Sequence, residues 1–311
     1  MATCDASLDR STAVPAAPAA GRADRAWVGI ALLATSALIS STAGLFTGAI
    51  AADAWTIVFW RGLVGGSIIA AWIVVRDRRR APGSFLRMGR PGLLVCACSA
   101  VATICFINAL RLTSVADVTI IFATAPFLAA ALAWAWTAER PSRRTVGASL
   151  LALAGVALMV GADTAGGLAG HLLALAMTGL LAAMMVAIRR HRATSMLPAS
   201  CLSAFVSAAL VLPVAQPAVG LGIDLVFLLL FGAQFGLTLL TLTMGSRLVS
   251  APRAALLGNL ELPLAPVLVW LAFGAVPAVA TVLGGAIVAA AILWDLGPGR
   301  PPWHGRGKNP A

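Results

Sequence analysis

The sequence predicts an all-α integral membrane protein, with ten transmembrane helices arranged as two inverted five-helix repeats. Three observations lead to this prediction: an apolar composition, a one-sided distribution of arginine and a weak internal repeat. Of the 311 residues, 60% are hydrophobic and 11% are charged, whereas a soluble domain has about 25% charged residues. Runs of about 20 apolar residues are typical of membrane-crossing helices, and ten such runs follow one another here.

The predicted spans are joined by loops too short to hold a soluble domain, so we expect the function to lie inside the helical bundle. Spans 1 to 5 form a first repeat, 27–162, and spans 6 to 10 form a second, 169–296. Cytoplasmic tails are expected at 1–26, whose composition predicts disorder, and at 297–311. The spans are predicted at 27–48, 54–75, 91–110, 115–137, 145–162, 169–188, 198–215, 224–244, 254–274 and 278–296.

Every basic residue except Arg61 and Arg111 falls in a terminal tail or in a loop that follows an even-numbered span. Cytoplasmic loops of membrane proteins are enriched in arginine and lysine, so both termini and these loops are expected in the cytoplasm. All but one of the basic residues are arginine and alanine is abundant, which is typical of a GC-rich bacterial genome. The expected location is therefore the bacterial inner (plasma) membrane.

The net charge of +11 does not indicate a nucleic-acid partner, because it is spread over separate loops on one predicted side of a membrane. The five cysteines show no Cys-x-x-Cys or Cys/His spacing typical of a metal site. We therefore expect no nucleic acid, no metal and no cofactor. The expected partners are the lipid bilayer and a small-molecule substrate, with proton coupling and a homodimer as open alternatives.

The second half of the chain repeats the first at an offset of 136 to 137 residues. Each half has five spans, and an odd number of spans gives the halves opposite orientations. Arg111 is then expected outside, as the inverted counterpart of Arg247. Inverted repeats are typical of secondary transporters, in which one half moves against the other. The matches are Arg111-Leu112-x-Ser114 with Arg247-Leu248-x-Ser250, Pro126 with Pro263, and Gly147 with Gly284.

Four stretches resemble the EamA branch of the drug/metabolite transporter (DMT) superfamily. They are WTIVFWRG at 55–62, INALRLTSVADVTIIFATAPFLAA at 107–130, AERPSRRTVGASLLALAGVALMV at 138–160 and LLGNLELPLAPVLVW at 256–270. The resemblance covers 27–296 as two EamA units and implies a transporter, not an enzyme. One departure follows span 9: the family often has Gly-Glu-x-Pro there, and this chain has Gly274-Ala275-Val276-Pro277, whereas Glu139 keeps the first-half counterpart.

Glu261 and Arg61 are charged residues expected at membrane depth, where charge is unfavourable and usually functional. Two roles are open for Glu261: a group that couples protons or binds an amine, and a protonated carboxyl that bonds a neighbouring helix. Three roles are open for Arg61. It binds a substrate carboxylate, pairs with Glu261, or extends back to the lipid headgroups.

Prolines occupy matching places in spans 4 and 9, at Pro126 and at Pro263 with Pro266. Proline removes a helical N–H and leaves a carbonyl without its partner. Interrupted helices in corresponding positions of two repeats are a pointer to a transporter's binding site, and simple kinks for packing are the alternative. Thr124 and Glu261 each lie two residues before a matched proline.

Polar residues recur at helical spacing in two other spans. Gln234 and Thr238 share one face of span 8, and Asn108 lies in span 3. Such residues line an aqueous cavity or simply bond across helices. With Glu261, Arg61 and Thr124 they complete the predicted set of substrate or coupling residues.

The function that best fits these patterns is secondary active transport. The predicted protein moves a small metabolite, an amino acid or a related compound, outward across the membrane by alternating access. A channel or a non-transporting membrane partner is the first alternative, although it gives no reason for an inverted repeat with paired prolines. A lipid-modifying enzyme is the second, although the loops offer no cluster of nucleophile, acid and base.

Overall fold

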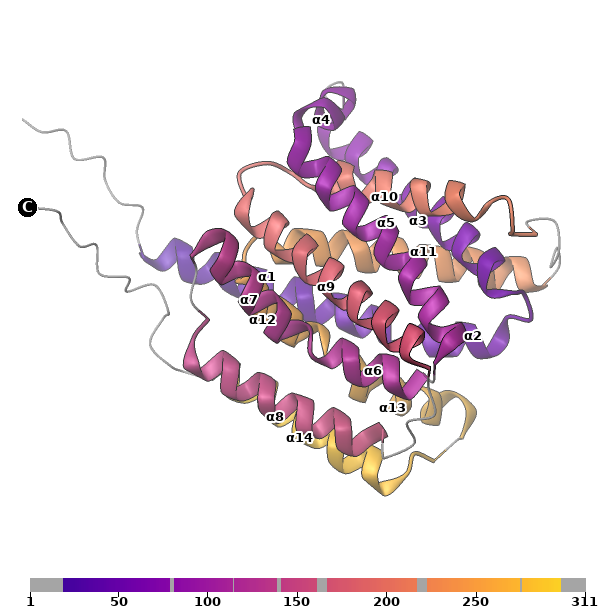
Figure 1. The fold of residues 1–311 in the computed structure, drawn as a ribbon. Coiled ribbons are helices and arrows are strands. Elements are labelled where there is room, and N and C mark those ends of the chain that lie inside the picture. The colour runs from indigo at the N-terminus through magenta and orange to yellow at the C-terminus, as the bar shows by residue number, and fades with distance from the viewer. Residues whose placement is uncertain are drawn as a thin grey trace, which may run out of the picture.

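The computed structural model describes residues 19–78, 81–113, 115–138, 141–160, 167–216, 223–274 and 276–297. Throughout these ranges the chain consists of helices and connecting turns, with no strand. Figure 1 shows α8 and α14 side by side along one edge of a helical bundle, with α4 at the opposite edge. The helices are α1 (Ala19–Ser41), α2 (Ala43–Ala49), α3 (Ala54–Asp77), α4 (Ala81–Arg87), α5 (Gly89–Leu112), α6 (Val115–Ala123), α7 (Ala125–Thr137), α8 (Arg143–Val160), α9 (Leu168–Arg190), α10 (Leu197–Val211), α11 (Ile223–Ser246), α12 (Ala251–Gly258), α13 (Glu261–Phe273) and α14 (Val279–Leu296).

Nine segments within the described ranges are long and apolar enough to cross a membrane. Six are single helices, and three are pairs in which one helix continues another: α1 with α2, α6 with α7, and α12 with α13. Large apolar side chains cover the outside of the bundle, as at Leu271, which is 72% exposed, and Leu293, which is 68% exposed. Soluble proteins rarely expose so much contiguous apolar surface, so the chain is a multi-pass membrane protein.

The segment expected as the seventh span, 198–215, coincides with α10, which is shorter than the other spans. Its 15 residues extend about 22 Å at a rise of about 1.5 Å per residue, whereas the hydrocarbon core of a bilayer is about 30 Å thick. Most of its side chains are buried, and it packs against α3, α5 and α11. Protein rather than lipid therefore surrounds most of α10, and ten full crossings stay a prediction.

Asp53 starts α3 with a side-chain cap. Its Oδ2 accepts hydrogen bonds from the backbone N–H groups of Trp55 at 3.0 Å and Thr56 at 3.2 Å, which have no partner within the helix. The Thr56 hydroxyl donates to Asp53 Oδ1 at 2.6 Å and accepts from the backbone N–H of Gln216 at 2.9 Å. One short network thus caps α3 and fixes the chain that leaves α10.

Two of the membrane-crossing segments are interrupted. α6 and α7 meet at Thr124, while α12 and α13 meet at Asn259 and Leu260. At the first break the N–H of Phe127 donates to Thr124 O at 2.9 Å, and at the second the N–H of Leu260 donates to Leu257 O at 3.1 Å. These bonds span three residues instead of four, so the helix tightens at each break and its direction changes.

The helices after these breaks end in the same way. Ala138 follows α7 with φ 51°, and Gly274 follows α13 with φ 70°, so both residues are left-handed. The N–H of each bonds back to a carbonyl of the last helical turn, from Trp134 and Trp270 respectively. Glycine adopts this conformation freely, whereas the Cβ of Ala138 makes it unfavourable.

Glycines let the backbones of several helix pairs approach closely. A Cβ on Gly155 of α8 would lie 2.7 Å from Gly284 O of α14, and a Cβ on Gly284 would collide with Gly155 O. A Cβ on Gly236 of α11 would lie 2.9 Å from the Cα of Gly65 in α3. Small residues at such crossings allow van der Waals packing between membrane helices, which here fixes α8 on α14 and α3 on α11.

Candidate functional site

Arg61 is held in α3 between aromatic rings of α11. The Cζ of its guanidinium group lies 4.8 Å from the ring centroid of Phe231 and 4.5 Å from that of Phe235, within the range of a cation–π interaction. Its Nε is buried and has no hydrogen-bond partner among the described residues. The arginine therefore points into the bundle, not back toward headgroups, and part of its donor capacity is unused.

Glu261 is the first residue of α13, directly after the turn at Asn259 and Leu260. Its carboxylate interacts electrostatically with Arg61, and the Ser40 hydroxyl of α1 acts on it as a hydrogen-bond donor. The ion pairs in the described part of the chain join other residues, so Arg61 and Glu261 attract each other without direct contact. Opposite charges from α3 and α13 thus lie near enough to interact, although they do not form an ion pair.

One face of α11 lines this site. Phe231, Gln234, Phe235 and Thr238 follow one another at the spacing of a single helical stripe. Gln234 Nε2 donates to Ile39 O at 2.8 Å and to the carbonyl of the adjacent residue of α1 at 3.3 Å. The Gln234 side chain therefore joins α11 to α1, next to the α1 serine whose hydroxyl donates to Glu261.

Ser36 and Thr238 make a second bond between the same two helices. The Ser36 hydroxyl donates to Thr238 O at 3.0 Å, while Thr238 Oγ1 is buried and has no partner among the described residues. The structure thus brings together four of the predicted residues, Arg61, Glu261, Gln234 and Thr238. It adds three that the sequence analysis did not single out: Ser40, Phe231 and Phe235.

A family model matches this chain over the region that contains Arg61. The matching family is the EamA-like transporter family, over residues 27–161. These residues belong to that family. It is part of the DMT superfamily, so the resemblance expected from the sequence motifs is confirmed for this first part of the chain. No curated protein matches the chain.

The chain also shares its fold with solved structures. One protein of known crystal structure is 21% identical, and the alignment covers 88% of this chain and 97% of that protein, with a TM-score of 0.76. At this identity the likeness concerns the fold alone. Because it extends over most of the chain, the fold of both halves follows a known helical arrangement.

Thr124 and Asn108 lie elsewhere in the EamA fold. Thr124 occupies the break between α6 and α7, where its hydroxyl donates to Ile121 O at 2.6 Å. Asn108 lies in α5 and donates from Nδ2 to Ile104 O at 2.9 Å, within its own helix. Neither side chain joins the group around Arg61 and Glu261 through a described contact.

The three prolines have different positions relative to the breaks. Pro126 is in the first turn of α7 and Pro263 is in the first turn of α13. Backbone N–H groups in a first turn have no partner within the helix, so proline removes no helical hydrogen bond there. Pro266 lies inside α13, which continues to Phe273. It leaves the Leu262 carbonyl without a helical donor, so the first turns of α13, next to Glu261, are held by fewer backbone bonds than an ordinary helix.

Two buried carboxylates lie at opposite ends of the bundle. Asp117 Oδ2 is 3.2 Å from His171 Nε2 and accepts from the Thr113 hydroxyl at 2.9 Å. Asp295 Oδ2 is 2.6 Å from Arg253 Nε. These groups join helices that are distant in the sequence, so no local motif could have identified them as partners.

Asp295 connects helices from both halves of the chain. Its Oδ1 accepts from the Thr145 hydroxyl of α8 at 2.8 Å, its Oδ2 accepts from Arg253 Nε of α12, and its backbone carbonyl accepts from Arg253 Nη2 at 3.1 Å. Charge-assisted bonds of this kind are stronger than neutral ones. The network fixes the ends of α8, α12 and α14, and it leaves the region around Arg61 separate.

The chemistry available at the site is charge recognition. A guanidinium group with an unused Nε, a carboxylate of opposite charge and the phenyl ring of Phe235 can hold a ligand that carries both charges and an apolar part. Within the described ranges, no group of three His, Cys, Asp or Glu side chains is arranged to hold a metal ion.

Proposed function

We propose that this EamA-family protein is a secondary active transporter that exports an amino acid or a related small metabolite across the bacterial inner membrane by alternating access. The family of residues 27–161 supports membrane transport. The observation that carries the substrate proposal is the relation between Arg61 and Glu261, which attract each other without forming an ion pair and which both lie in predicted membrane spans.

A zwitterionic ligand fits this pair better than a neutral or singly charged one. Its carboxylate would accept hydrogen bonds from Arg61, and its ammonium group would donate to Glu261 and to the Ser40 hydroxyl. Each charge inside the bundle would then have a partner, which is the condition under which ionised groups are tolerated at membrane depth. The half-buried ring of Phe235 would lie beside the apolar part of the ligand, whereas Phe231 is buried and holds Arg61 in place.

Arg61 and Glu261 also come from different halves of the proposed inverted repeat, so relative movement of the halves would change the distance between them. Helix packing supports the repeat, because exchanging spans 1 to 5 with spans 6 to 10 converts most of the main helix pairs into other packed pairs. The pairs α3/α10 and α8/α14 convert into themselves, α5/α9 into α1/α11, α5/α10 into α3/α11, α6/α9 into α1/α12, and α7/α9 into α1/α13.

The backbone supports the same repeat. The left-handed residues Ala138 and Gly274 are 136 positions apart, and each ends the second part of an interrupted span. Asn259 and Ala123, at the two interruptions, are separated by the same number of residues. An offset that recurs in helix ends, helix breaks and sequence motifs is unlike a chance alignment of apolar helices.

Sidedness follows from the proposed ten spans, with both termini in the cytoplasm. Reporter fusions inserted at 163–168 and 217–223 test this directly. We expect signals of a periplasmic location from both loops, and of a cytoplasmic location from a fusion after residue 300. A cytoplasmic signal from either inserted loop is incompatible with two inverted groups of five spans.

Transport is tested with purified protein in proteoliposomes that are loaded with a mixture of amino acids. We expect saturable exchange of zwitterionic compounds, and loss of at least about tenfold in initial rate for Arg61→Gln, because a charge-assisted hydrogen bond contributes about 1.5–3 kcal/mol. Asp224→Asn, at the start of α11, removes a charge outside this site and is the matched control. Linear, non-saturable flux would favour a channel instead.

Proton coupling through Glu261 is a separate part of the proposal. With an imposed pH gradient, we expect wild-type protein to accumulate substrate. Glu261→Gln should lose accumulation but retain counterflow exchange at a reduced rate, because the ammonium group loses its charged partner. Wild-type accumulation and pH dependence in Glu261→Gln would rule out Glu261 as the coupling group. Loss of both activities, with normal folding, would assign Glu261 to substrate binding alone.

A further inference from the structure

The ends of α3 and α11 lie together at the arginine-rich end of the bundle. Ile73 and Leu240 belong to one buried cluster, against which Met244 and the Phe85 side chain of α4 are packed. Arg76 follows one turn after Ile73, and Arg247 comes directly after the end of α11. We refer to these two arginines as the Arg76–Arg247 pair.

The Arg76–Arg247 pair places two positive charges near each other. Burial and repulsion by Arg76 both lower the pKa of the Arg247 guanidinium group. Arg247 donates from Nε at 3.2 Å and from Nη2 at 2.6 Å to the backbone carbonyl of Arg192, so a neutral oxygen atom, not a carboxylate, accepts these bonds. The ion pairs within the described ranges involve neither arginine.

The nearest acidic residue in the sequence does not neutralise this pair. Asp77 Oδ2 accepts a hydrogen bond from the Ser84 hydroxyl at 2.6 Å, which joins α3 to α4. Arg78, the next residue, has φ 45°, a conformation that glycine adopts much more readily. An arginine thus occupies a strained backbone position two residues after Arg76, where glycine would suit the backbone better.

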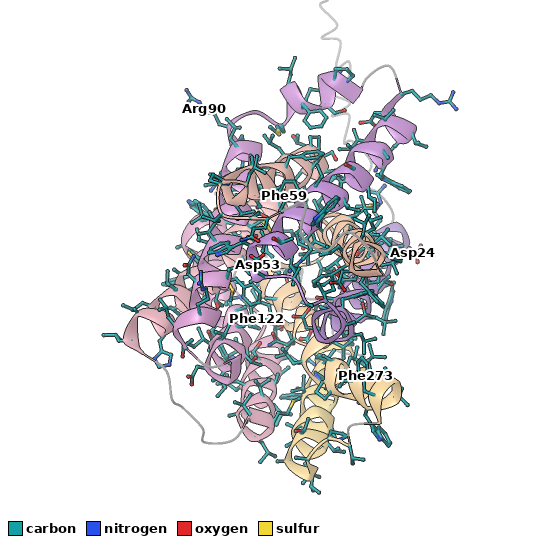
Figure 2. The ribbon with its side chains drawn as sticks, turned by 90° about the vertical axis from the view of Figure 1, so that its right-hand side faces the viewer. Asp24, Asp53, Phe59, Arg90, Phe122 and Phe273 are labelled. Carbon is teal, nitrogen blue, oxygen red and sulfur yellow. The ribbon has the colours of Figure 1, made fainter. Side chains whose placement is uncertain are left out.

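Apolar side chains lie beside these charges. Leu86 of α4 is 86% exposed, and Val75 of α3 is 73% exposed. Arg87 and Arg90 are also exposed in the same segment, and Figure 2 shows the Arg90 side chain at the rim of the bundle, directed away from it. Exposed apolar groups next to exposed guanidinium groups match the border between acyl chains and lipid headgroups.

We propose that the Arg76–Arg247 pair binds the phosphodiester group of an anionic phospholipid, whose acyl chains lie against Val75 and Leu86. Guanidinium groups match phosphate oxygens in geometry and charge and bind them in a bidentate manner. A bound phosphate would turn the repulsion between the two arginines into shared attraction. The apolar surface beside the pair favours a lipid over a free anion.

Native mass spectrometry of the detergent-solubilised full chain tests this proposal. Dioleoyl phosphatidylglycerol and dioleoyl phosphatidylcholine are offered at equal concentration. We expect wild-type protein to retain phosphatidylglycerol preferentially, and Arg76→Gln/Arg247→Gln to lose at least about tenfold of that preference, equivalent to about 1.4 kcal/mol. Arg143→Gln, at the exposed start of α8, removes one positive charge elsewhere, as Arg76→Gln does at the site, and should keep the wild-type preference.

Three further results decide the assignment. Arg76→Gln alone changes an exposed side chain, so it should fold normally and still weaken retention severalfold, even if the double variant is unstable. Equal retention of the two lipids by wild-type protein would overturn the proposal, as would an equal loss in Arg143→Gln. Displacement of phosphatidylglycerol by millimolar inorganic phosphate would also overturn it, because the site would then recognise a free anion.

Discussion

The side-chain amide of Asn259 donates a hydrogen bond to the backbone carbonyl of Ala123, with 3.2 Å between nitrogen and oxygen. In a continuous helix that carbonyl would accept from Phe127, whose N–H here donates to Thr124. The break between α6 and α7 therefore exposes a carbonyl, and the break between α12 and α13 supplies its donor. The two interruptions are one structural unit.

Removal of this donor should destabilise the bundle. In Asn259→Ala the buried Ala123 carbonyl loses its partner, and we expect the free energy of unfolding to fall by about 1 to 3 kcal/mol. Chemical denaturation in detergent micelles measures the change. Asn108→Ala is the matched control, because Asn108 bonds a carbonyl of its own helix and its loss should have a smaller effect. Equal losses in the two variants would contradict the special role of Asn259.

A glycine in place of Ala138 should stabilise the protein. Ala138 has φ 51°, and a left-handed non-glycine residue is unfavourable by about 1–2 kcal/mol, so Ala138→Gly should raise the thermal midpoint. The reciprocal change, Gly274→Ala, should lower it. A Cβ at Gly274 meets no atom within 4 Å, so that loss would report backbone strain alone. A lower midpoint in Ala138→Gly would show that helix termination there does not depend on the left-handed residue.

The contact between α8 and α14 should not tolerate a single added methyl group. In Gly284→Ala the new Cβ meets the Gly155 carbonyl, which cannot rotate away, and overpacking of this kind costs about 1–3 kcal/mol. Gly179→Ala in α9 is the control, because a Cβ there meets nothing within 4 Å. That change should be neutral or stabilising, since alanine favours helix more than glycine. The comparison uses thermal unfolding in one detergent.

The Asp53 cap gives the stability of α3 a defined dependence on pH. Partial burial raises the pKa of Asp53, but hydrogen bonds from Thr56 and Trp55 outweigh it and hold the pKa below its usual 3.8. The ionised cap therefore stabilises the folded protein fully at pH values above the pKa that Asp53 has in the unfolded chain. This stabilisation is lost as the pH falls through the lower pKa that Asp53 has in the folded protein. Asp53→Asn should be less stable than wild type at pH 7, with the difference shrinking toward pH 3. A constant difference would refute the charge-based cap.

Much of the fold could be predicted from the sequence because membrane burial leaves a direct signal in hydropathy. The helices begin and end near the predicted spans, and the matched prolines mark the segments in which α7 and α13 start after a break. The lengths of individual spans could not be predicted. α10 is enclosed by other helices, so its apolar sequence reflects contact with protein as well as with lipid.

The candidate site was only partly predictable. Arg61 and Glu261 were found because charge is rare in apolar segments, and helical spacing identified the α11 face through Gln234 and Thr238. Phe231 and Phe235 lie on that same stripe, but phenylalanine is unremarkable in a membrane helix, so only the position of Arg61 reveals them. Contacts such as Thr145 with Asp295 join residues 150 positions apart, for which a single sequence holds no signal.

The enclosure of α10 also constrains the order in which the protein is assembled. α10 is too short to match the bilayer and carries the buried serines Ser200, Ser203 and Ser207, the first of which bonds Thr243 of α11 at 2.8 Å. α11 is synthesised after α10, so α10 leaves the ribosome before its main polar partner exists. Its main packing partners α3 and α5 are made before it, so we expect these two helices to hold α10 first and the Ser200 bond to attach it to α11 afterwards.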